Sequence, residues 1–211
     1  MKLTVFGATG GIGREIVRQG LAAGHQVTAV VRDPARLAVT GERLEVVEVA
    51  GFDDAASLRA AVAGRHAVLS GLGPRTRKQV GVASALTRPV LRALEAEGTR
   101  RFLAVSAAPL GPVPADETLF LRLLTPVVSR VLSAHYDDLR LMEDEMRRSA
   151  TDWTAVRPPQ LLDRPLTGRY RTAVGTGLRG GARIARADVA HAMLAMIDDT
   201  ATVQQPVAVA Y

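Results

Sequence analysis

The chain has 211 residues, of which 47% are hydrophobic and 23% are charged, and this composition is typical of a soluble globular protein with one large core. The absence of cysteine excludes a disulfide scaffold, a thiol nucleophile and a thiolate metal site. The net charge of +6 invites a nucleic-acid interpretation, but the basic residues are spread along the whole chain and aromatic residues make up only 4% of it, so we expect no nucleic-acid partner.

The first thirteen residues predict a strand, a tight turn and a helix. Residues 3–6 are β-branched, aromatic or apolar, three glycines follow at three-residue spacing, and residues 14–19 carry apolar side chains at helical period. A dinucleotide needs this geometry because its pyrophosphate binds the unpaired N–H groups at the positive end of a helix. We expect Gly7 to permit the turn, Gly10 to let the phosphate approach the backbone, and Gly13 to pack the helix on the strand.

The second strand, residues 26–31, decides between the two dinucleotides. An acidic residue at its end binds the ribose 2′-OH of NAD, whereas an arginine there accommodates the 2′-phosphate of NADP. Arg32 comes first at this end, and Arg36 follows one turn later. Asp33, followed by Pro34, is better explained as the N-cap of a short helix. The prediction is therefore NADP(H), and the alternative is that both arginines are ordinary surface charges.

The rest of the chain alternates between strands and helices. This order predicts an α/β fold of the Rossmann type, with a doubly wound parallel sheet and helices on both faces. We expect a single domain over residues 1–211, with a small substrate-side elaboration at about 107–185, and we expect Trp153 in the core at the sheet edge. The expected strands are 44–49, 67–70, 101–105 and 152–157, and the expected helices are 55–63, 80–97, 119–133 (interrupted by Pro126) and 135–149.

Ligands of such sheets bind at the carboxyl ends of the strands, and the polar loops of this chain fall there. Besides the glycine turn, these ends carry Leu72-Gly73, Ser106 and Arg157-Pro158-Pro159. The basic run 75–78 follows the fourth strand, and we interpret it either as a mobile lid over the cofactor or as an exposed loop.

Five segments of the chain resemble a known family. They are GATGGIG, VRDPARL, LGPR, VSA and above all RPPQLLDRPLTGRYR. They are similar to atypical short-chain dehydrogenase/reductases of the NAD(P)H-binding, NmrA-like group, and within it to the biliverdin IXβ reductases, also called flavin reductases. The resemblance covers nearly the whole chain. It implies a usually monomeric, NADPH-dependent reductase of flavins or other planar conjugated acceptors.

The resemblance also implies roles for residues of this chain. The residues expected at the cofactor are Gly7, Thr9, Gly10, Gly11 and Ile12 at the pyrophosphate, Arg32 and Arg36 at the 2′-phosphate, Leu72, Gly73 and Arg75 at the adenosine or nicotinamide side, Ser106 beside the nicotinamide, and Pro158. Arg157 and Gln160 are the expected substrate-binding residues.

Several positions depart from the family pattern. The usual Gly-Asp after the third strand is Ala50-Gly51 here, so Asp53 or Asp54 is expected to substitute for the aspartate, or Phe52 to pack on adenine or fill the core. Gln160 and Leu139 stand where the biliverdin reductases carry histidines, and Arg157 stands where they carry an apolar residue. These changes weaken the case for a tetrapyrrole substrate but not for reductase chemistry.

The candidate catalytic residues are Ser106 and Tyr136. Tyr136 and Arg140 have the spacing of the Tyr-Lys pair of typical short-chain dehydrogenases, but arginine differs from lysine in geometry and reach. Tyr136 is therefore either a proton donor or a packing residue, and Ser106 either orients the reactants or only satisfies the backbone. A flavin or quinone acceptor needs no protein acid, since nicotinamide supplies hydride and water supplies the proton. The acidic residues 137–138 and 143–145 are expected on a solvated helix face.

The sequence is compatible with two functions. The first is an NADPH-dependent reductase of a flavin, quinone or similar compound, with a role in secondary metabolism as one setting. The second is a non-catalytic NADP(H)-binding sensor, because a fold does not fix a function. Either way we expect a small-molecule ligand, a monomer or weak homodimer, no metal, no membrane partner and a location in the cytoplasm, since the sequence shows neither a leader nor an 18-residue apolar run.

Overall fold

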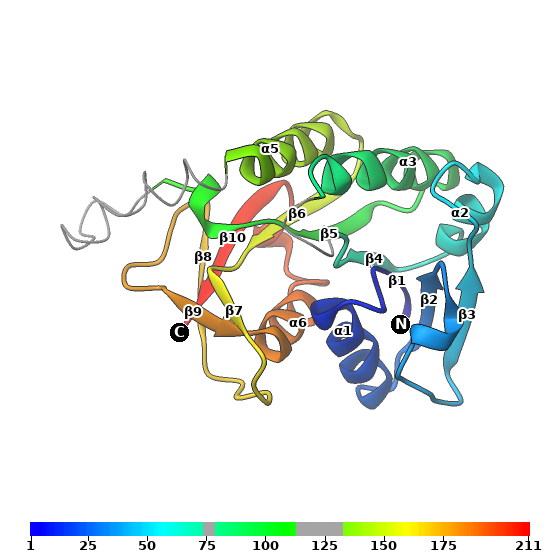
Figure 1. Cartoon of the computed structure of the whole chain (residues 1–211), viewed down its shortest axis with the longest axis horizontal. Coiled ribbons are helices and arrows are strands. Elements are labelled where there is room, and N and C mark those ends of the chain that lie inside the picture. The colour runs from blue at the N-terminus through cyan, green and yellow to red at the C-terminus, as the bar shows by residue number, and fades with distance from the viewer. Residues whose placement is uncertain (74–78, 113–132) are drawn as a thin grey trace.

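A computed structural model of the chain describes residues 1–73, 79–112 and 133–211. Its centre is an eight-stranded sheet in the order β3-β2-β1-β4-β5-β6-β10-β8 (Figure 1). All neighbours in it are parallel except β10 and β8. The strands are β1 (Lys2–Phe6), β2 (Gln26–Val31), β3 (Leu44–Glu48), β4 (Ala67–Ser70), β5 (Arg101–Val105), β6 (Asp152–Arg157), β8 (Arg171–Val174) and β10 (Gln205–Ala210). The predicted doubly wound α/β fold is confirmed.

Helices cover both faces of the sheet. On one face lie α1 (Gly11–Ala22) and α6 (Arg186–Ala195), and on the other lie α2 (Ala55–Val62), α3 (Val82–Glu97) and α5 (Ser133–Arg148) (Figure 1). The alternation of strand side chains builds one core on each face: Leu3 and Val5 pack toward α1, and Phe6 packs toward α2 and α3. Because the strands other than β8 run parallel, their carboxyl ends lie at one edge of the sheet.

Three short 3₁₀ turns and a small second sheet complete the described fold. The 3₁₀ turn η1 (Pro34–Arg36) follows β2, η2 (Ala108–Leu110) follows β5, and η3 (Thr200–Thr202) precedes β10. A two-stranded parallel sheet joins β7 (Gln160–Leu162) to β9 (Arg183–Ala185) beside α6.

The observed elements agree with the predicted ones from β1 to β6, and Asp33 caps η1 as expected by accepting a hydrogen bond from the Ala35 amide. The prediction for Trp153 was half wrong. Its side chain is buried, but β6 is not an edge strand because β10 pairs with its free side. The predicted helix 119–133 and the basic run 75–78 fall on or extend into segments outside the described residues.

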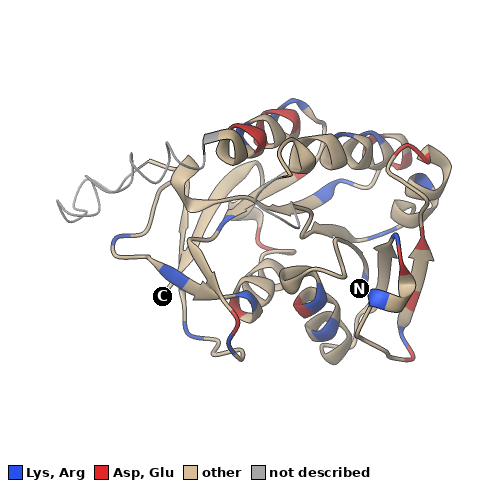
Figure 2. Ribbon diagram, in the orientation of Figure 1, with Lys and Arg blue, Asp and Glu red and all other residues tan. Residues whose placement is uncertain are grey.

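Charged residues are spread along the described chain rather than gathered in one element (Figure 2). Basic and acidic segments alternate along α1 and α5 and along the loops in Figure 2. None of the helices in the described part of the chain is long and apolar enough to cross a bilayer.

Candidate functional site

The glycine turn after β1 is packed tightly against the loop that follows β4. Gly7 has a φ of +73°, and a Cβ there would lie 2.7 Å from the carbonyl carbon of Gly71. A Cβ on Gly13 would lie 2.1 Å from the carbonyl oxygen of Gly7. Only glycine fits either position, because backbone atoms cannot move aside as a flexible side chain can. The turn and the close helix–strand packing predicted for these glycines are both present.

The N-terminus of α1 carries no anionic side chain. Its N-cap is Gly10, which has an extended backbone (φ −84°) and a Cβ position that would meet only backbone, 3.2 Å from the Gly7 oxygen. No acidic residue lies in the first turn. The first amides of a helix have no acceptor within it, so they are available to an external anion. Thr9, Gly11 and Ile12 line this end, with Ile12 buried and able to offer only its backbone.

The N-termini of α2 and α3 are occupied by protein carboxylates, whereas that of α6 is not. Asp54 caps α2 through the Ser57 amide at 3.0 Å. Asp138 reaches from α5 to the start of α3, where it accepts hydrogen bonds from the amides of Ala83 and Ser84 at 2.9 and 3.1 Å. Asp188 lies in the first turn of α6, but its carboxylate accepts hydrogen bonds from the loop amides of Thr167 and Gly168 and does not cap the helix. Of α1, α2, α3 and α6, therefore, α1 and α6 have no carboxylate of the described residues hydrogen-bonded to their first amides.

Two basic side chains lie at the carboxyl end of β2, the strand next to the glycine turn. Arg32 and Arg36 are both exposed, and neither forms an ion pair with any described residue. Asp33, between them, is engaged as the cap of η1. The arrangement suits a phosphate on the ribose better than a free ribose hydroxyl.

The loops after β3 and β4 carry further residues that the sequence predicts at the cofactor. The Leu72 amide donates to Ser70 Oγ at 3.3 Å, and Gly73 has open space at its Cβ position. Phe52 is partly buried and packs against the core, with its ring centroid 6.0 Å from that of Phe6. Asp54 is engaged as a cap, whereas Asp53 is exposed. Arg75 lies outside the described residues.

A buried polar network stands at the carboxyl ends of β5 and β6. Ser106 Oγ donates to Glu143 Oε1 at 2.7 Å, and Arg157 donates to both carboxylate oxygens, from Nε at 2.9 Å and from Nη2 at 2.6 Å. Arg147 adds a fourth hydrogen bond, to Oε2 at 2.8 Å. The side chain of Glu143 is 1% exposed and that of Arg157 is 9% exposed. All four donations converge on one carboxylate, which links two of the predicted site residues to α5.

The prediction of a solvated acidic face on α5 was wrong for two residues. Glu143 and Asp138 are both buried, at the Ser106 network and at the start of α3. The sequence contains a signal for this, because both residues lie on the apolar stripe formed by Leu139, Met142 and Met146 at helical spacing. A charged residue on an apolar stripe implies a buried partner.

The predicted proton donor has no activating partner among the described residues. Tyr136 is half-buried, and burial raises the pKa of its phenol. Arg140, at the lysine position, is exposed and forms an ion pair with Asp137 at 2.7 Å. A raised pKa makes the phenol a weaker acid, which is the opposite of what proton donation at neutral pH requires.

The remaining predicted residues lie after β6. Pro158 is buried, and its carbonyl accepts a hydrogen bond from the Ala108 amide at 2.9 Å, which ties the loop after β6 to the loop after β5. Gln160 is exposed at the start of β7, where its amide donates to the Ala182 carbonyl. The structure therefore brings Ser106, Arg157 and Pro158 together and leaves Gln160 at the surface.

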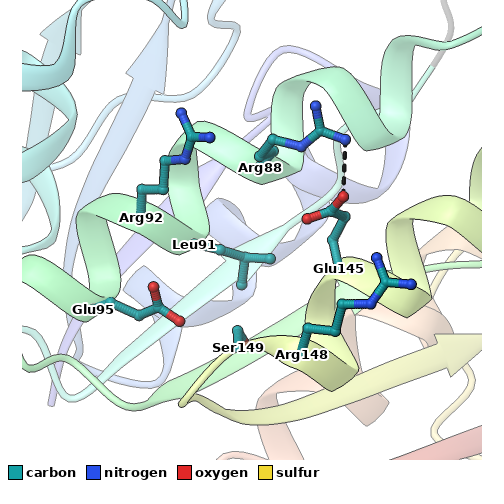
Figure 3. A pocket seen from close by; sticks show the side chains of 7 residues that line it. All are labelled: Arg88, Leu91, Arg92, Glu95, Glu145, Arg148 and Ser149. Carbon is teal, nitrogen blue, oxygen red and sulfur yellow. Dashed lines mark hydrogen bonds and ion pairs between the residues drawn. The ribbon is translucent and has the colours of Figure 1, made fainter.

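A separate groove of about 390 Å³ lies between α3 and α5 (Figure 3). It is crossed by an ion pair between Arg88 and Glu145 at 2.8 Å and includes none of the predicted site residues. Its lining consists of Arg88, Leu91, Arg92, Glu95, Glu145, Arg148 and Ser149.

Comparison with known proteins agrees with this geometry. The model of a family described as NAD(P)H-binding matches residues 7–200. Among solved structures, a short-chain dehydrogenase/reductase from Veillonella parvula in complex with NADP is 20% identical, with a TM-score of 0.81 over 100% of this chain and 94% of that one. An anaerobillin reductase from Escherichia coli O157:H7 is 21% identical, with a TM-score of 0.79 over 100% and 97%. A candidate NADH-flavin reductase from Streptococcus pneumoniae TIGR4 is 23% identical, with a TM-score of 0.77 over 100% and 99%.

Proposed function

Because the chain belongs to the NAD(P)H-binding family, we propose that it is an NADPH-dependent oxidoreductase that transfers hydride to a flavin, a quinone or a similar planar conjugated small molecule. The observation that carries this proposal is the commitment of the Ser106 proton to Glu143. With that proton engaged and the Tyr136 pKa raised, the described site lacks a strong acid. Acceptors that are reduced without a protein acid fit such a site best.

The preference for NADPH over NADH is supported by the two exposed arginines after β2. Arg32 and Arg36 offer the guanidinium groups that bind a phosphate ester, and the one carboxylate between them is used as a helix cap. The bound nicotinamide supplies the hydride. The open end of α1 supplies amides for its pyrophosphate.

Ser106 acts as a positioning residue in this proposal. Its hydroxyl has one proton, and that proton is donated to Glu143, so the oxygen presents only lone pairs to a ligand. A ligand group facing Ser106 must therefore be a donor, such as the carboxamide N–H of the nicotinamide. Arg157 holds Glu143 in place and is itself neutralised by it. We infer that Arg157 shapes the acceptor pocket without offering a free charge to an anionic substrate.

The acceptor class also draws support from two of the solved structures. One is named as a reductase of anaerobillin, the other as a flavin reductase candidate, and both names refer to conjugated ring systems. For this chain we further propose that residues 107–185 form the acceptor side of a single domain, and that the protein acts as a monomer or weak homodimer in the cytoplasm.

A second candidate function is a non-catalytic NADP(H) sensor. It is favoured by the Tyr136–Arg140 pair, in which the cation is held by Asp137 and cannot serve the phenol. The two functions are separated by measuring NADPH binding and then NADPH oxidation with FMN, a quinone and biliverdin as acceptors. Turnover with any of them supports the reductase, tight binding without turnover supports the sensor, and absence of NADPH binding refutes both.

A further inference from the structure

Arg186, the first residue of α6, extends its side chain over the N-terminus of α1. A Cβ built on Gly11 would lie 2.5 Å from Arg186 Cδ and 2.8 Å from its Nε. The arginine therefore fills the space that any other residue at position 11 would occupy. Gly11 is needed here for the passage of a side chain, and this reason differs from the backbone contacts that require Gly7 and Gly13.

The position of this cation is electrostatically unfavourable without an anion. A cation in the first turn of α6 lies at the positive end of its own helix, and its guanidinium lies beside the positive end of α1. The first turn of α6 contains a carboxylate, Asp188, but its oxygens accept hydrogen bonds from the amides of Thr167 and Gly168 and from the Tyr211 hydroxyl. Asp188 is thus directed at the loop after β7.

The anion that Arg186 does contact is weakly placed. Arg186 Nη1 lies 2.7 Å from Asp163 Oδ1, but the Asp163 side chain is 85% exposed and that of Arg186 is 30% exposed. An ion pair this exposed contributes little. Two helix N-termini and a guanidinium thus converge where the described residues supply one solvated carboxylate.

We propose that Arg186 is a cofactor-binding residue that contacts the pyrophosphate from the α6 side, in the slot left open by Gly11. The inference rests on the proposed function only through its cofactor and is independent of the acceptor. It makes α6, through Arg186, part of the phosphate site. The two arginines would then bind different phosphate groups. Arg186 would contact the pyrophosphate, which NADPH and NADH share, and Arg32 would contact the 2′-phosphate, which only NADPH carries.

The test measures the dissociation constants of NADPH and NADH for the full chain and its variants, by the fluorescence of the reduced nicotinamide. Arg186→Ala should raise the dissociation constants of both cofactors by the same factor, about tenfold for the loss of one charge-assisted contact. Arg183→Ala is the matched control, since it removes an equal charge from an exposed side chain three residues earlier and should change either constant by less than about twofold.

Gly11→Ala is a second variant that keeps the arginine but displaces it. Its new Cβ meets only the flexible end of Arg186, so the fold should survive, as circular dichroism would show. We expect Gly11→Ala to weaken the binding of both cofactors. The variant that combines Gly11→Ala with Arg186→Ala should bind them no more weakly than Arg186→Ala alone.

Three outcomes overturn the inference. They are unchanged affinity in Arg186→Ala, a loss confined to NADPH, and an equal loss in Arg183→Ala. Failure of the unaltered chain to bind either cofactor would instead refute the proposed function.

Discussion

Replacing Glu143 by Gln should destabilise the protein strongly although it changes almost no volume. The carboxylate accepts four hydrogen bonds, and a glutamine offers one oxygen and turns an NH₂ group toward the other donors. Arg147 is 43% exposed and can exchange its bond for water, so the penalty falls mainly on Arg157. Breaking a buried ion pair costs about 3–5 kcal/mol.

This loss is measurable against the whole free energy of unfolding. Proteins of this kind have an unfolding free energy of about 5–15 kcal/mol, so the variant should remain folded or nearly so at room temperature. Its midpoint of thermal unfolding should fall by roughly 6–20 °C. The assay is urea unfolding followed by circular dichroism, with the denaturant slope compared between variants to confirm a common unfolding reaction.

Glu145→Gln is the matched control for this prediction. It makes the same substitution two residues along α5, in an ion pair with Arg88 whose side chains are 21% and 45% exposed, and should cost less than about 1 kcal/mol. Replacing both partners by apolar residues, Glu143→Leu with Arg157→Met, should recover much of the loss. Equal effects of Glu143→Gln and Glu145→Gln would refute the buried network and would make Arg157 available to a substrate anion.

Three further predictions concern the cofactor and the chemistry. Arg32→Ala should weaken NADPH by roughly 1.5–3 kcal/mol and leave NADH nearly unchanged in a binding titration, and equal losses would contradict the 2′-phosphate assignment. Gly10→Val should abolish binding of both cofactors while circular dichroism stays unchanged, because φ at this residue is ordinary and the added side chain enters the phosphate space; retained affinity would reduce the turn to a structural role. Tyr136→Phe should lower the turnover number by less than about tenfold. Ser106→Ala should raise the activation free energy by on the order of 1 kcal/mol, through one lost hydrogen bond. A thousandfold loss of turnover number in Tyr136→Phe would instead identify Tyr136 as a proton donor and an isolated ketone as the substrate.

The parts of the fold that could be predicted are those that depend on the local sequence. The glycine turn, the Asp33 cap and the strands up to β6 each depend on a local pattern of a few residues. The strand β10 and the helix α6 were not predicted, because their places are set by pairing with distant segments: Val207 pairs with Val156, and Gln19 of α1 donates to the Ala187 carbonyl of α6.

The difference between local patterns and long-range contacts also explains which candidate site residues could be predicted. Ser106 and Arg157 could be predicted because each directly follows or ends a strand, where parallel sheets bind ligands. The apolar stripe of α5 could have indicated that Glu143 is buried, but not its partners, because Ser106 and Arg157 come from the ends of two distant strands. The contact between Arg186 and Gly11 could not be predicted, because the two residues lie on different helices far apart in the sequence.

The position of β10 has a consequence for how the protein folds. This strand is the last element of the described chain, yet it lies inside the sheet, with β6 on one side and β8 on the other. Until it arrives, β6 presents an open row of backbone donors and acceptors. A chain emerging from the ribosome therefore cannot close its sheet before residues 205–210 are free, and the delay leaves an unpaired edge exposed to neighbouring chains. Expression at lower temperature or with a chaperone should thus favour folded product.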